Sequence, residues 1–375
     1  MELYTVRAGD TLPALARRFG CSPEALAHAN HLSSRRLTPG LALLLPSEAG
    51  GGREALVFAY ARPDIAGEIL DETLPALSAL CSFSGRLSEE GGLLLPENGL
   101  LPAHIRAGGA APLLVLSNLT DSGGFSGRTA HTLLASPALQ EAALDELLAF
   151  LDREAWAGAV FHLQYLFPFD REAYSRFIRR AAERLHEGGY LAVSALAPPE
   201  DAGAEGLLCG AQDCAAHGEA ADYVILLSFE WGHPDSAPQA LSPLPRVRRA
   251  VARAAALLPP GKLLMGLSHH GCRWRLPWRQ GDEGAFLGSA AAQELGISLG
   301  AGVRYDESAA AAFFTCEDAA GERSVVWYED ARSLLARLHV AEEYGLAGVC
   351  LWTADRLYRP TLQLLRQHMP GMKIL

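Results

Sequence analysis

The sequence has few features that would point to a nucleic acid or a membrane. In its 375 residues no basic stretch is longer than two residues, and the formal net charge is −11. Because phosphate binding needs clustered Lys and Arg, we expect neither a nucleic-acid partner nor an anionic membrane surface. No apolar run reaches the roughly 20 residues of a membrane helix. The N-terminus has no basic segment followed by an apolar one, so we predict no signal peptide and expect cytoplasmic synthesis.

Cysteines are also few, and their pattern does not indicate a disulfide framework. The chain has 7 scattered cysteines, an odd number, with no Cys-x-x-Cys pair. We expect free thiols in a reducing compartment, with disulfides or a zinc site as the alternative. The sequence gives no reason to predict a metal or a cofactor.

Residues 1–47 are predicted to form one β-α-α-β unit. Gly9-Asp10-Thr11 is a turn with a helix N-cap signal, and Ser22 caps a second helix that begins at Pro23. The remaining residues 54–375 suit a barrel of about 250 residues or more. Residues 48–53 are Gly-rich and are predicted to be a linker. The four expected elements of the first unit cover residues 3–6, 12–19, 23–30 and 41–45.

The string from Tyr4 to Pro46 resembles a LysM module almost from end to end. The matching residues are Tyr4, Val6, Gly9, Asp10, Thr11, Leu12, Ala16, Phe19, Gly20, Asn30, Leu32, Pro39, Gly40 and Pro46. LysM modules bind the N-acetylglucosamine backbone of peptidoglycan or chitin. The resemblance implies a shallow groove formed by Gly9, Asp10, Thr11, Leu12, Asn30, His31 and Leu32. Alternatively these positions only shape a small core, which we favour for Gly9, Leu12 and Phe19.

Residues 54–375 alternate short apolar runs with amphipathic stretches, which predicts an α/β protein with a (β/α)8 TIM barrel. Function in such barrels lies where strands end and loops begin. The expected helices include 136–153, 171–187 and 244–257. Between strands seven and eight, residues 273–332 are predicted to be a small α+β insertion that walls one side of the barrel mouth. The expected strands are 55–60, 79–83, 113–116, 159–165, 190–196, 223–229, 262–267 and 348–352.

The barrel resembles family-18 glycoside hydrolases, especially those of spore-forming bacteria that join LysM modules to an N-acetylglucosaminidase acting on spore cortex. The matching strings are FDREAYSRFIRRAAERLHEGGYLAVSALAP, ADYVILLSFEWG, GKLLMG, YDESAAAAFF and VVWYEDARS. In this family the N-acetyl oxygen of the sugar attacks the anomeric carbon, an exception to the two-carboxylate scheme. A Glu at the end of strand four protonates the leaving oxygen, and an Asp two residues earlier orients the acetamide.

The acidic residues of that motif are absent. The family string runs roughly Asp-Gly-x-x-x-Asp-x-Glu-Tyr, and Gly158 and Tyr165 fix its register on this chain. The three acids are then replaced by Ala157, His162 and Gln164. Loss of a general acid lowers the rate by roughly 10²–10⁴, and loss of an electrostatic stabiliser by about 10²–10³. We therefore predict that little ordinary hydrolysis survives.

Other residues at the predicted strand ends suit sugar binding. We expect a cleft formed by Gln164, Tyr165, Phe229, Glu230, Trp231, Trp274 and Trp352, in which aromatic rings stack on sugar. Phe229 stands where the family usually has Tyr. Glu230 is a candidate replacement acid. A metal site built from His162, His269 and His270 is an alternative to a polar pocket lining, although no carboxylate is in register with them.

These residues predict a non-catalytic protein that binds peptidoglycan or chitin-like N-acetylglucosamine oligomers. The first alternative is an active N-acetylglucosaminidase that uses Glu230 or a histidine. The second is a structural spore-coat protein with other coat proteins as partners. Association with the spore coat or cortex is implied by the resemblance alone.

Overall fold

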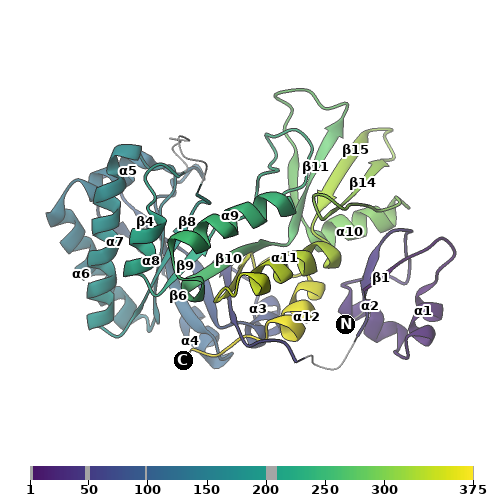
Figure 1. The fold of residues 1–375 in the computed structure, drawn as a ribbon, viewed down its shortest axis with the longest axis horizontal. Coiled ribbons are helices and arrows are strands. Elements are labelled where there is room, and N and C mark those ends of the chain that lie inside the picture. Colours follow the sequence, from purple (N-terminus) through teal and green to yellow (C-terminus); the bar gives the residue numbers. More distant parts are fainter. Residues whose placement is uncertain (1–2, 47–50, 98, 200–208, 375) are drawn as a thin grey trace.

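The eight parallel strands predicted from the sequence form a closed barrel. The computed structural model describes residues 3–46, 51–97, 99–199 and 209–374, so part of the predicted linker 48–53 lies outside the described residues. Each strand pairs with the next, and β16 closes the ring against β3. Figure 1 shows the barrel with its helices, and the N-terminal unit in purple at the right. The barrel strands are β3 (Leu56–Ala61), β4 (Ala79–Leu87), β6 (Ala111–Ser117), β7 (Gly158–His162), β8 (Leu191–Leu196), β9 (Tyr223–Leu226), β10 (Leu263–Ser268) and β16 (Gly348–Trp352).

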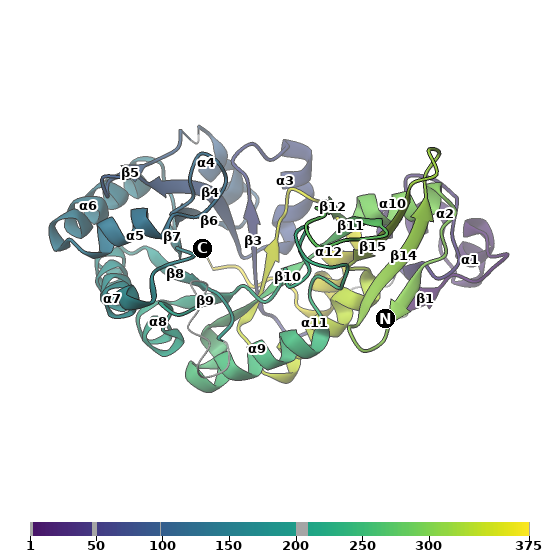
Figure 2. The same cartoon turned by 90° about the horizontal axis from the view of Figure 1, so that it is seen from above.

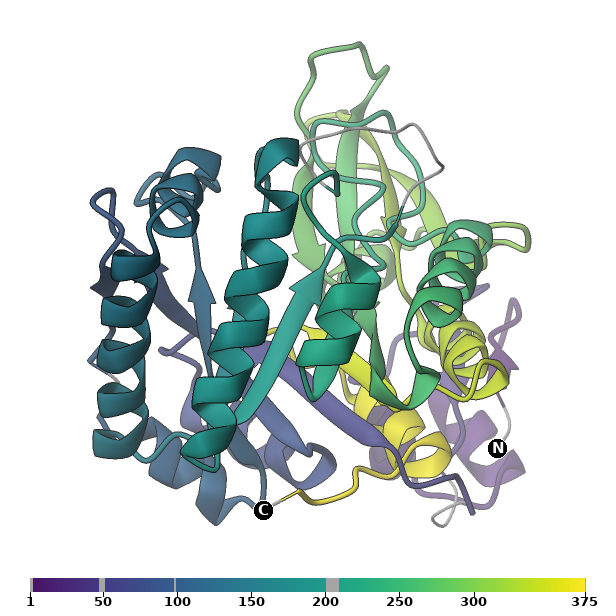
Figure 3. The same cartoon turned by 60° about the vertical axis from the view of Figure 1, so that its left-hand side comes forward.

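Helices cover the outside of the barrel, as Figure 3 shows for the long teal pair. The three helices predicted from the sequence are present as α6, α7 and α9. In the described residues no helix is both long and apolar enough to cross a membrane. The helices are α3 (Gly67–Thr73), α4 (Leu101–Ala107), α5 (Gly127–Leu134), α6 (Pro137–Arg153), α7 (Arg171–Glu187), α8 (Cys214–Ala220), α9 (Leu244–Leu257), α11 (Ala331–Glu343) and α12 (Arg359–His368).

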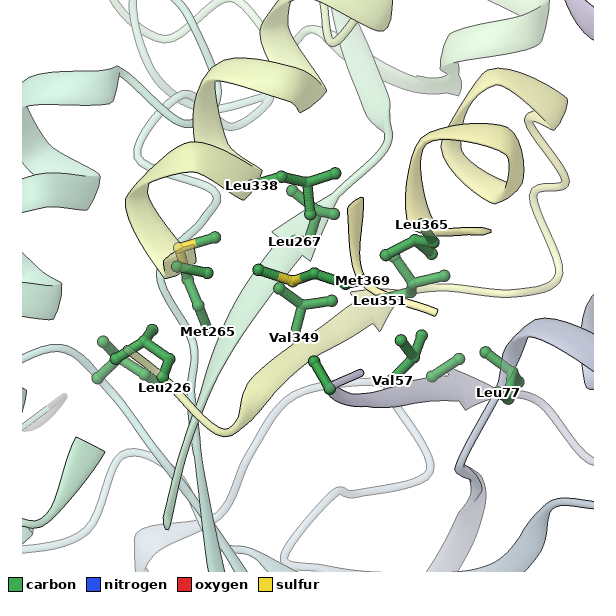
Figure 4. Packing of buried hydrophobic residues seen from close by; sticks show 14 of the residues in the cluster. Val57, Leu77, Leu226, Met265, Leu267, Leu338, Val349, Leu351, Leu365 and Met369 are labelled. Atoms are coloured by element: carbon green, nitrogen blue, oxygen red, sulfur yellow. The ribbon is translucent and has the colours of Figure 1, made fainter. Parts of the chain in front are cut away.

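The alternation of side chains along each strand separates two packed layers. On β3, Val57 faces outward toward the helices, whereas Phe58 faces the barrel interior. Figure 4 shows the outer layer, where Val349 and Leu351 of β16 lie near Met369, which follows α12. The barrel interior is therefore a filled core, and only its mouth is open to a ligand.

The predicted strands four and six end earlier than expected. β7 ends at His162 and β9 at Leu226. Soon after each end the backbone takes a left-handed conformation, with φ of 54° at Tyr165 and 64° at Glu230. Such a turn cannot continue a strand. Both segments therefore leave the barrel wall and enter its mouth.

The segment between β10 and β16 is the predicted α+β insertion. It holds a five-stranded antiparallel sheet in the order β12-β11-β15-β14-β13. β11 already begins at His270, which is earlier than the predicted boundary at Arg273. Figure 2 shows the insertion between the barrel and the N-terminal unit. Its elements are β11 (His270–Leu276), β12 (Ala285–Gly288), α10 (Ser289–Ser298), β13 (Arg304–Asp306), β14 (Ala311–Glu317) and β15 (Arg323–Tyr328).

A buried ion pair fastens this insertion to the barrel. Arg337 of α11 bonds Glu329, which follows β15, at 3.0 Å, and both side chains are buried. Arg337 also donates to the carbonyl oxygens of Ala310 and Ser242. Burial raises the pKa of Glu329 to about 7. Removing one partner of such a pair would leave an uncompensated charge in the core.

The N-terminal unit has the predicted β-α-α-β order, with β1 and β2 antiparallel. Thr11 and Ser22 cap its two helices, since each hydroxyl accepts a bond from a backbone N–H three residues on. In the barrel domain, outside this unit, the short strand β5 (Leu93–Leu94) pairs antiparallel with the end of β4. The elements of the N-terminal unit are β1 (Leu3–Thr5), α1 (Leu12–Arg18), α2 (Pro23–Ala29) and β2 (Ala42–Leu44).

Three buried histidines make the fold sensitive to acid. Burial lowers the pKa values of His162, His217 and His269 to about 4, so these rings are neutral at pH 7. In the unfolded chain a histidine titrates near pH 6.5. Between about pH 6.5 and 4 the unfolded state therefore binds more protons than the folded state, and stability falls as the pH falls.

We predict that the free energy of unfolding decreases from pH 7 to pH 5, by up to about 1.4 kcal/mol per pH unit for each buried histidine. His217 lies outside the barrel mouth, where its Nδ1 bonds Ser194 Oγ at 2.8 Å. His217→Gln should remove one of the three contributions and flatten the slope. Urea unfolding at pH 7, 6 and 5 measures the change of the unfolding free energy with pH. His28→Gln, at an exposed histidine, is the control. Equal slopes for wild type and His217→Gln would contradict the prediction.

Candidate functional site

The carboxyl ends of the barrel strands open into a cleft of about 1030 Å³. One wall comes from residues after β3 and β16, another from the segments that follow β4 and β6, and a third from the insertion. This is the end of a (β/α)8 barrel at which functional side chains collect. The side chains that line this cleft include Phe83, Phe125, Glu230, His270, Phe286 and Trp352.

His162 stands at the centre of the barrel mouth, at the end of β7. Its ring is buried and stacks on Phe125 at a centroid distance of 5.8 Å and on Trp352 at 6.3 Å. The Tyr60 hydroxyl lies 3.0 Å from its Nδ1. With its pKa lowered to about 4 by burial, the ring carries no charge at pH 7. The position that the sequence predicts for the orienting Asp of the family motif is therefore neutral.

Gln164 follows two residues later and is also buried, at 3% exposure. The Asn118 side chain holds its backbone, because Oδ1 accepts from Gln164 N at 3.0 Å and Nδ2 donates to Gln164 O at 2.8 Å. The Gln164 amide donates to the Ala195 carbonyl at 3.5 Å and does not line the cleft. Ala157, the third motif position, only bonds through its backbone to Pro112 and Leu191. Ala157 and Gln164 have no titratable proton, and His162 is neutral at pH 7.

Trp352 is the aromatic side chain that reaches the cleft from β16. Phe229 stacks on it at 5.6 Å with an interplanar angle of 21°. This packing requires Gly266 on β10, since a Cβ there would lie 2.5 Å from the Phe229 ring. Tyr60 and Phe83 meet Trp352 edge-on. The rings hold the half-buried Trp352 in one orientation, with an aromatic surface toward the cleft.

Glu230 and His270 form an acid–base pair on the cleft wall. Glu230 Oε1 lies 3.2 Å from His270 Nε2, and both residues line the cleft. The other ring nitrogen, Nδ1, faces Ser268 Oγ at 3.0 Å and the Trp352 carbonyl oxygen at 3.2 Å. When Nδ1 accepts from the Ser268 hydroxyl, Nε2 carries the proton and donates to the Glu230 carboxylate. Ser268 thus orients the ring toward Glu230.

Of the seven predicted contacts, two line the cleft, Glu230 and Trp352, whereas the other five do not: Gln164, Tyr165, Phe229, Trp231 and Trp274. Trp274 is completely buried with Leu241 and Cys272 beside the insertion sheet, away from the cleft. Trp231 packs against the outer barrel core and does not line the cleft either. The alternation of side chains along a strand cannot predict where Trp231 and Trp274 lie, because both residues follow the ends of barrel strands. Tyr165 is exposed at the rim, where its ring stacks on Phe125 at 6.1 Å.

The alternative of a metal site built from His162, His269 and His270 does not fit the geometry. His269 uses both ring nitrogens, on Thr353 O at 2.6 Å and Thr361 Oγ1 at 3.1 Å. Within the described ranges, the side chains close enough to share one ion are His339, Glu342 and His368, on α11 and α12 outside the cleft. The three barrel histidines therefore act as separate polar groups.

The first half of the predicted LysM groove is a well-defined turn. Gly9 has a φ of 87°, and the Asp10 carboxylate accepts from Arg7 N at 2.7 Å and from the Tyr4 hydroxyl at 2.8 Å. These bonds lower the pKa of Asp10. Thr11 caps α1, whereas Leu12 is fully buried in the small core. Leu12 therefore has a core role, as the alternative interpretation expects.

The second half of that groove faces the barrel. Asn30 is buried and its side chain bonds the backbone of Leu26 and Leu44, which fixes the end of α2 against β2. His31 has a φ of 54°, and its Nδ1 accepts from Arg359 N at 3.4 Å. Leu32 is half-buried and donates its N–H to Ala27. Asn30 thus shapes the loop, and His31 is the residue that it presents to the barrel.

Three aromatic residues of the barrel mouth were not predicted from the sequence: Tyr60, Phe83 and Phe125. Tyr60 and Phe83 end two of the predicted strands, so the rule that placed His162 could also have placed them. Phe125 follows β6 in a loop, where no periodicity indicates which residue turns inward.

The chain matches two known protein families and several known proteins. Residues 4–46 match the LysM domain, and residues 120–356 match the glycosyl hydrolases family 18. The cortical fragment-lytic enzyme of Bacillus subtilis (strain 168) is 33% identical over 282 residues, which are 75% of this chain and 65% of that protein. The chain thus spans slightly less than two thirds of that relative. The cortical fragment-lytic enzyme of Bacillus cereus is 30% identical over 94% of each chain.

A solved structure agrees over nearly the whole chain. The Bacillus cereus spore cortex-lytic enzyme SleL superposes with a TM-score of 0.91 at 25% sequence identity and covers 99% of each chain. The agreement includes the N-terminal unit as well as the barrel. The chain therefore belongs to the glycosyl hydrolases family 18 and carries a LysM domain before its barrel.

Proposed function

We propose that this protein binds N-acetylglucosamine-containing glycan through its LysM domain and its barrel cleft, without cutting the glycan by the route of the family. Neutral, buried His162 and Gln164 at the motif positions of the orienting Asp and the acid carry this proposal. The relatives named for cortex lysis support spore-cortex peptidoglycan as the glycan and the spore cortex as its location.

Binding is supported by the composition of the cleft. Trp352 and Phe125 offer aromatic surfaces, and Arg62, Asp64 and Asp355 offer charged hydrogen-bonding groups. Sugar sites commonly combine a few ring faces with a few polar groups that fix orientation. The cleft therefore keeps what it needs to hold a sugar chain although the motif acids are gone.

Loss of hydrolysis follows from proton chemistry. The positively charged transition state of the family needs an anion beside the acetamide and an acid at the leaving oxygen. His162 is uncharged at pH 7, and protonating it would place a positive charge next to a positive sugar ring. The amide of Gln164 cannot act as an acid. Together these changes remove at least the roughly 10²–10⁴ that a general acid supplies.

A second candidate function is hydrolysis with displaced chemistry. The observation that favours it is the Glu230–His270 pair, whose Oε1 and Nε2 atoms lie 3.2 Å apart on the cleft wall. The pair lies after β9 and β10, not at the end of β7. A leaving oxygen would have to approach from a different side than in the family motif.

We predict that titration calorimetry will detect N-acetylglucosamine oligomers bound to the full chain, and that Trp352→Ala will weaken binding by about fivefold or more. An aromatic stacking surface contributes on the order of 1 kcal/mol or more. Phe169→Ala is the matched control, because Phe169 is 73% exposed and does not line the cleft. Thermal melting shows that both variants fold. Absence of heat with wild type would contradict the proposal.

Restoring both acids should restore some cutting. We expect His162→Asp with Gln164→Glu to release reducing ends at least about 10²-fold faster than wild type. Burial at position 164 would raise the pKa of the new carboxyl group, which suits a general acid. Gln164→Glu alone is the control, since it lacks the orienting anion. A double variant no faster than wild type would count against the assigned register.

The second candidate makes an opposite prediction for wild type. If Glu230 serves as the acid, purified wild type cuts cortex peptidoglycan and Glu230→Gln lowers that rate by roughly 10²-fold or more. Asp235→Asn is a matched change at an exposed carboxylate outside the cleft. Chromatography of released fragments compares the three proteins. Equal rates for wild type and Glu230→Gln exclude Glu230 as the acid.

A further inference from the structure

A second pocket lies between the LysM domain and the barrel. Its volume is about 650 Å³, and it is bounded by four separate segments. His31 comes from the LysM loop, Glu72 from α3, Ala291 from α10 and Arg359 from α12. The LysM domain contributes His31 to the lining, and the barrel domain contributes the other residues.

The pocket adjoins the barrel cleft. Phe286, Asp355 and Arg356 line both spaces, so they form the ridge between them. Phe286 is 38% exposed, and its ring meets His270 of the cleft edge-on at 5.4 Å. A chain lying in the cleft could therefore continue over this ridge toward His31.

The docking of the LysM domain supports a lasting arrangement. Gln293 of α10 donates to Asn30 O at 2.8 Å and accepts from the Tyr358 hydroxyl at 3.1 Å. At the far end of the domain, Thr38 donates to Ala301 O at 2.7 Å, and a Cβ at Gly40 would lie 1.8 Å from Val303 O. Both ends of the LysM domain are thus held close to the insertion.

The lining suits sugar more than an apolar ligand. Phe286 offers a ring face, and Glu68, Arg356 and the Glu72–Arg359 pair offer charged groups. Burial and the neighbouring Arg359 lower the pKa of His31, so its ring is neutral at pH 7. A neutral imidazole can exchange hydrogen bonds with hydroxyl groups.

We propose that cleft and pocket form one path that binds a single N-acetylglucosamine chain, with the far end of the chain against the LysM loop at His31. This inference rests on the proposed function and adds a second set of subsites to it. Once the cleft holds one end, binding of the other end becomes intramolecular. Affinity should therefore rise strongly with chain length.

Titration calorimetry with the dimer and the hexamer of N-acetylglucosamine tests this path. For wild type we expect the hexamer to bind about 10²-fold more tightly than the dimer. Ala291→Trp places an indole in the second pocket from an exposed helix position that does not line the cleft. It should reduce hexamer affinity to nearly the dimer value and leave the dimer unchanged. Ala142→Trp, at an exposed position of α6 that lines neither space, should behave as wild type.

The outcomes separate this inference from the proposed function. If wild type binds both oligomers equally, or if Ala291→Trp leaves the hexamer unaffected, the shared path is wrong while glycan binding stands. An equal loss for dimer and hexamer also contradicts the path, because the substitution would then act on the cleft itself. If wild type binds neither oligomer, the proposed function fails and the path fails with it.

Discussion

The hydrogen bond between the Tyr60 hydroxyl and His162 fixes the centre of the barrel mouth. It ties β3 to β7 across the barrel and leaves His162 between Phe125 and Trp352. Burial among these rings excludes charge, which the pKa of about 4 for His162 reflects. A site built in this way is aromatic and neutral where a family-18 hydrolase needs an anion. The other changes at the site agree with this constraint.

Gln164 and Phe229 each resemble in shape the residue that the family usually has at that position, but each lacks its acidic or hydroxyl group. Gln164 keeps the volume of Glu but is held below the cleft through Asn118. Phe229 keeps the ring of the usual Tyr, stacks on Trp352 and lacks the hydroxyl. Titratable groups remain on the cleft wall, at Glu230 and His270, but they follow other strands. Our proposal of binding without cutting rests on the two neutral motif positions, and the second candidate function rests on this pair.

Much of the fold and part of the candidate site could be predicted from the sequence, because they depend on the pattern of apolar and polar residues within single strands and helices. Apolar runs gave the barrel strands, and the period of two along β7 placed positions 162 and 164 together. What failed depends on tertiary structure. Trp274 follows a strand end, yet it packs beside the insertion, and Phe125 enters the site from a loop without periodicity. The docking of His31 against Arg359 joins residues 328 positions apart, so no local pattern could reveal it.

We propose that the LysM domain and the barrel bind one glycan chain around a barrel mouth in which the predicted motif positions carry no acid. The most direct test is an assay of reducing ends released from purified spore-cortex peptidoglycan by the wild-type protein, with binding to the same material measured in parallel. The account predicts binding with no release above a heat-inactivated sample. Sustained release by wild type, free of contaminating lysins, would contradict it.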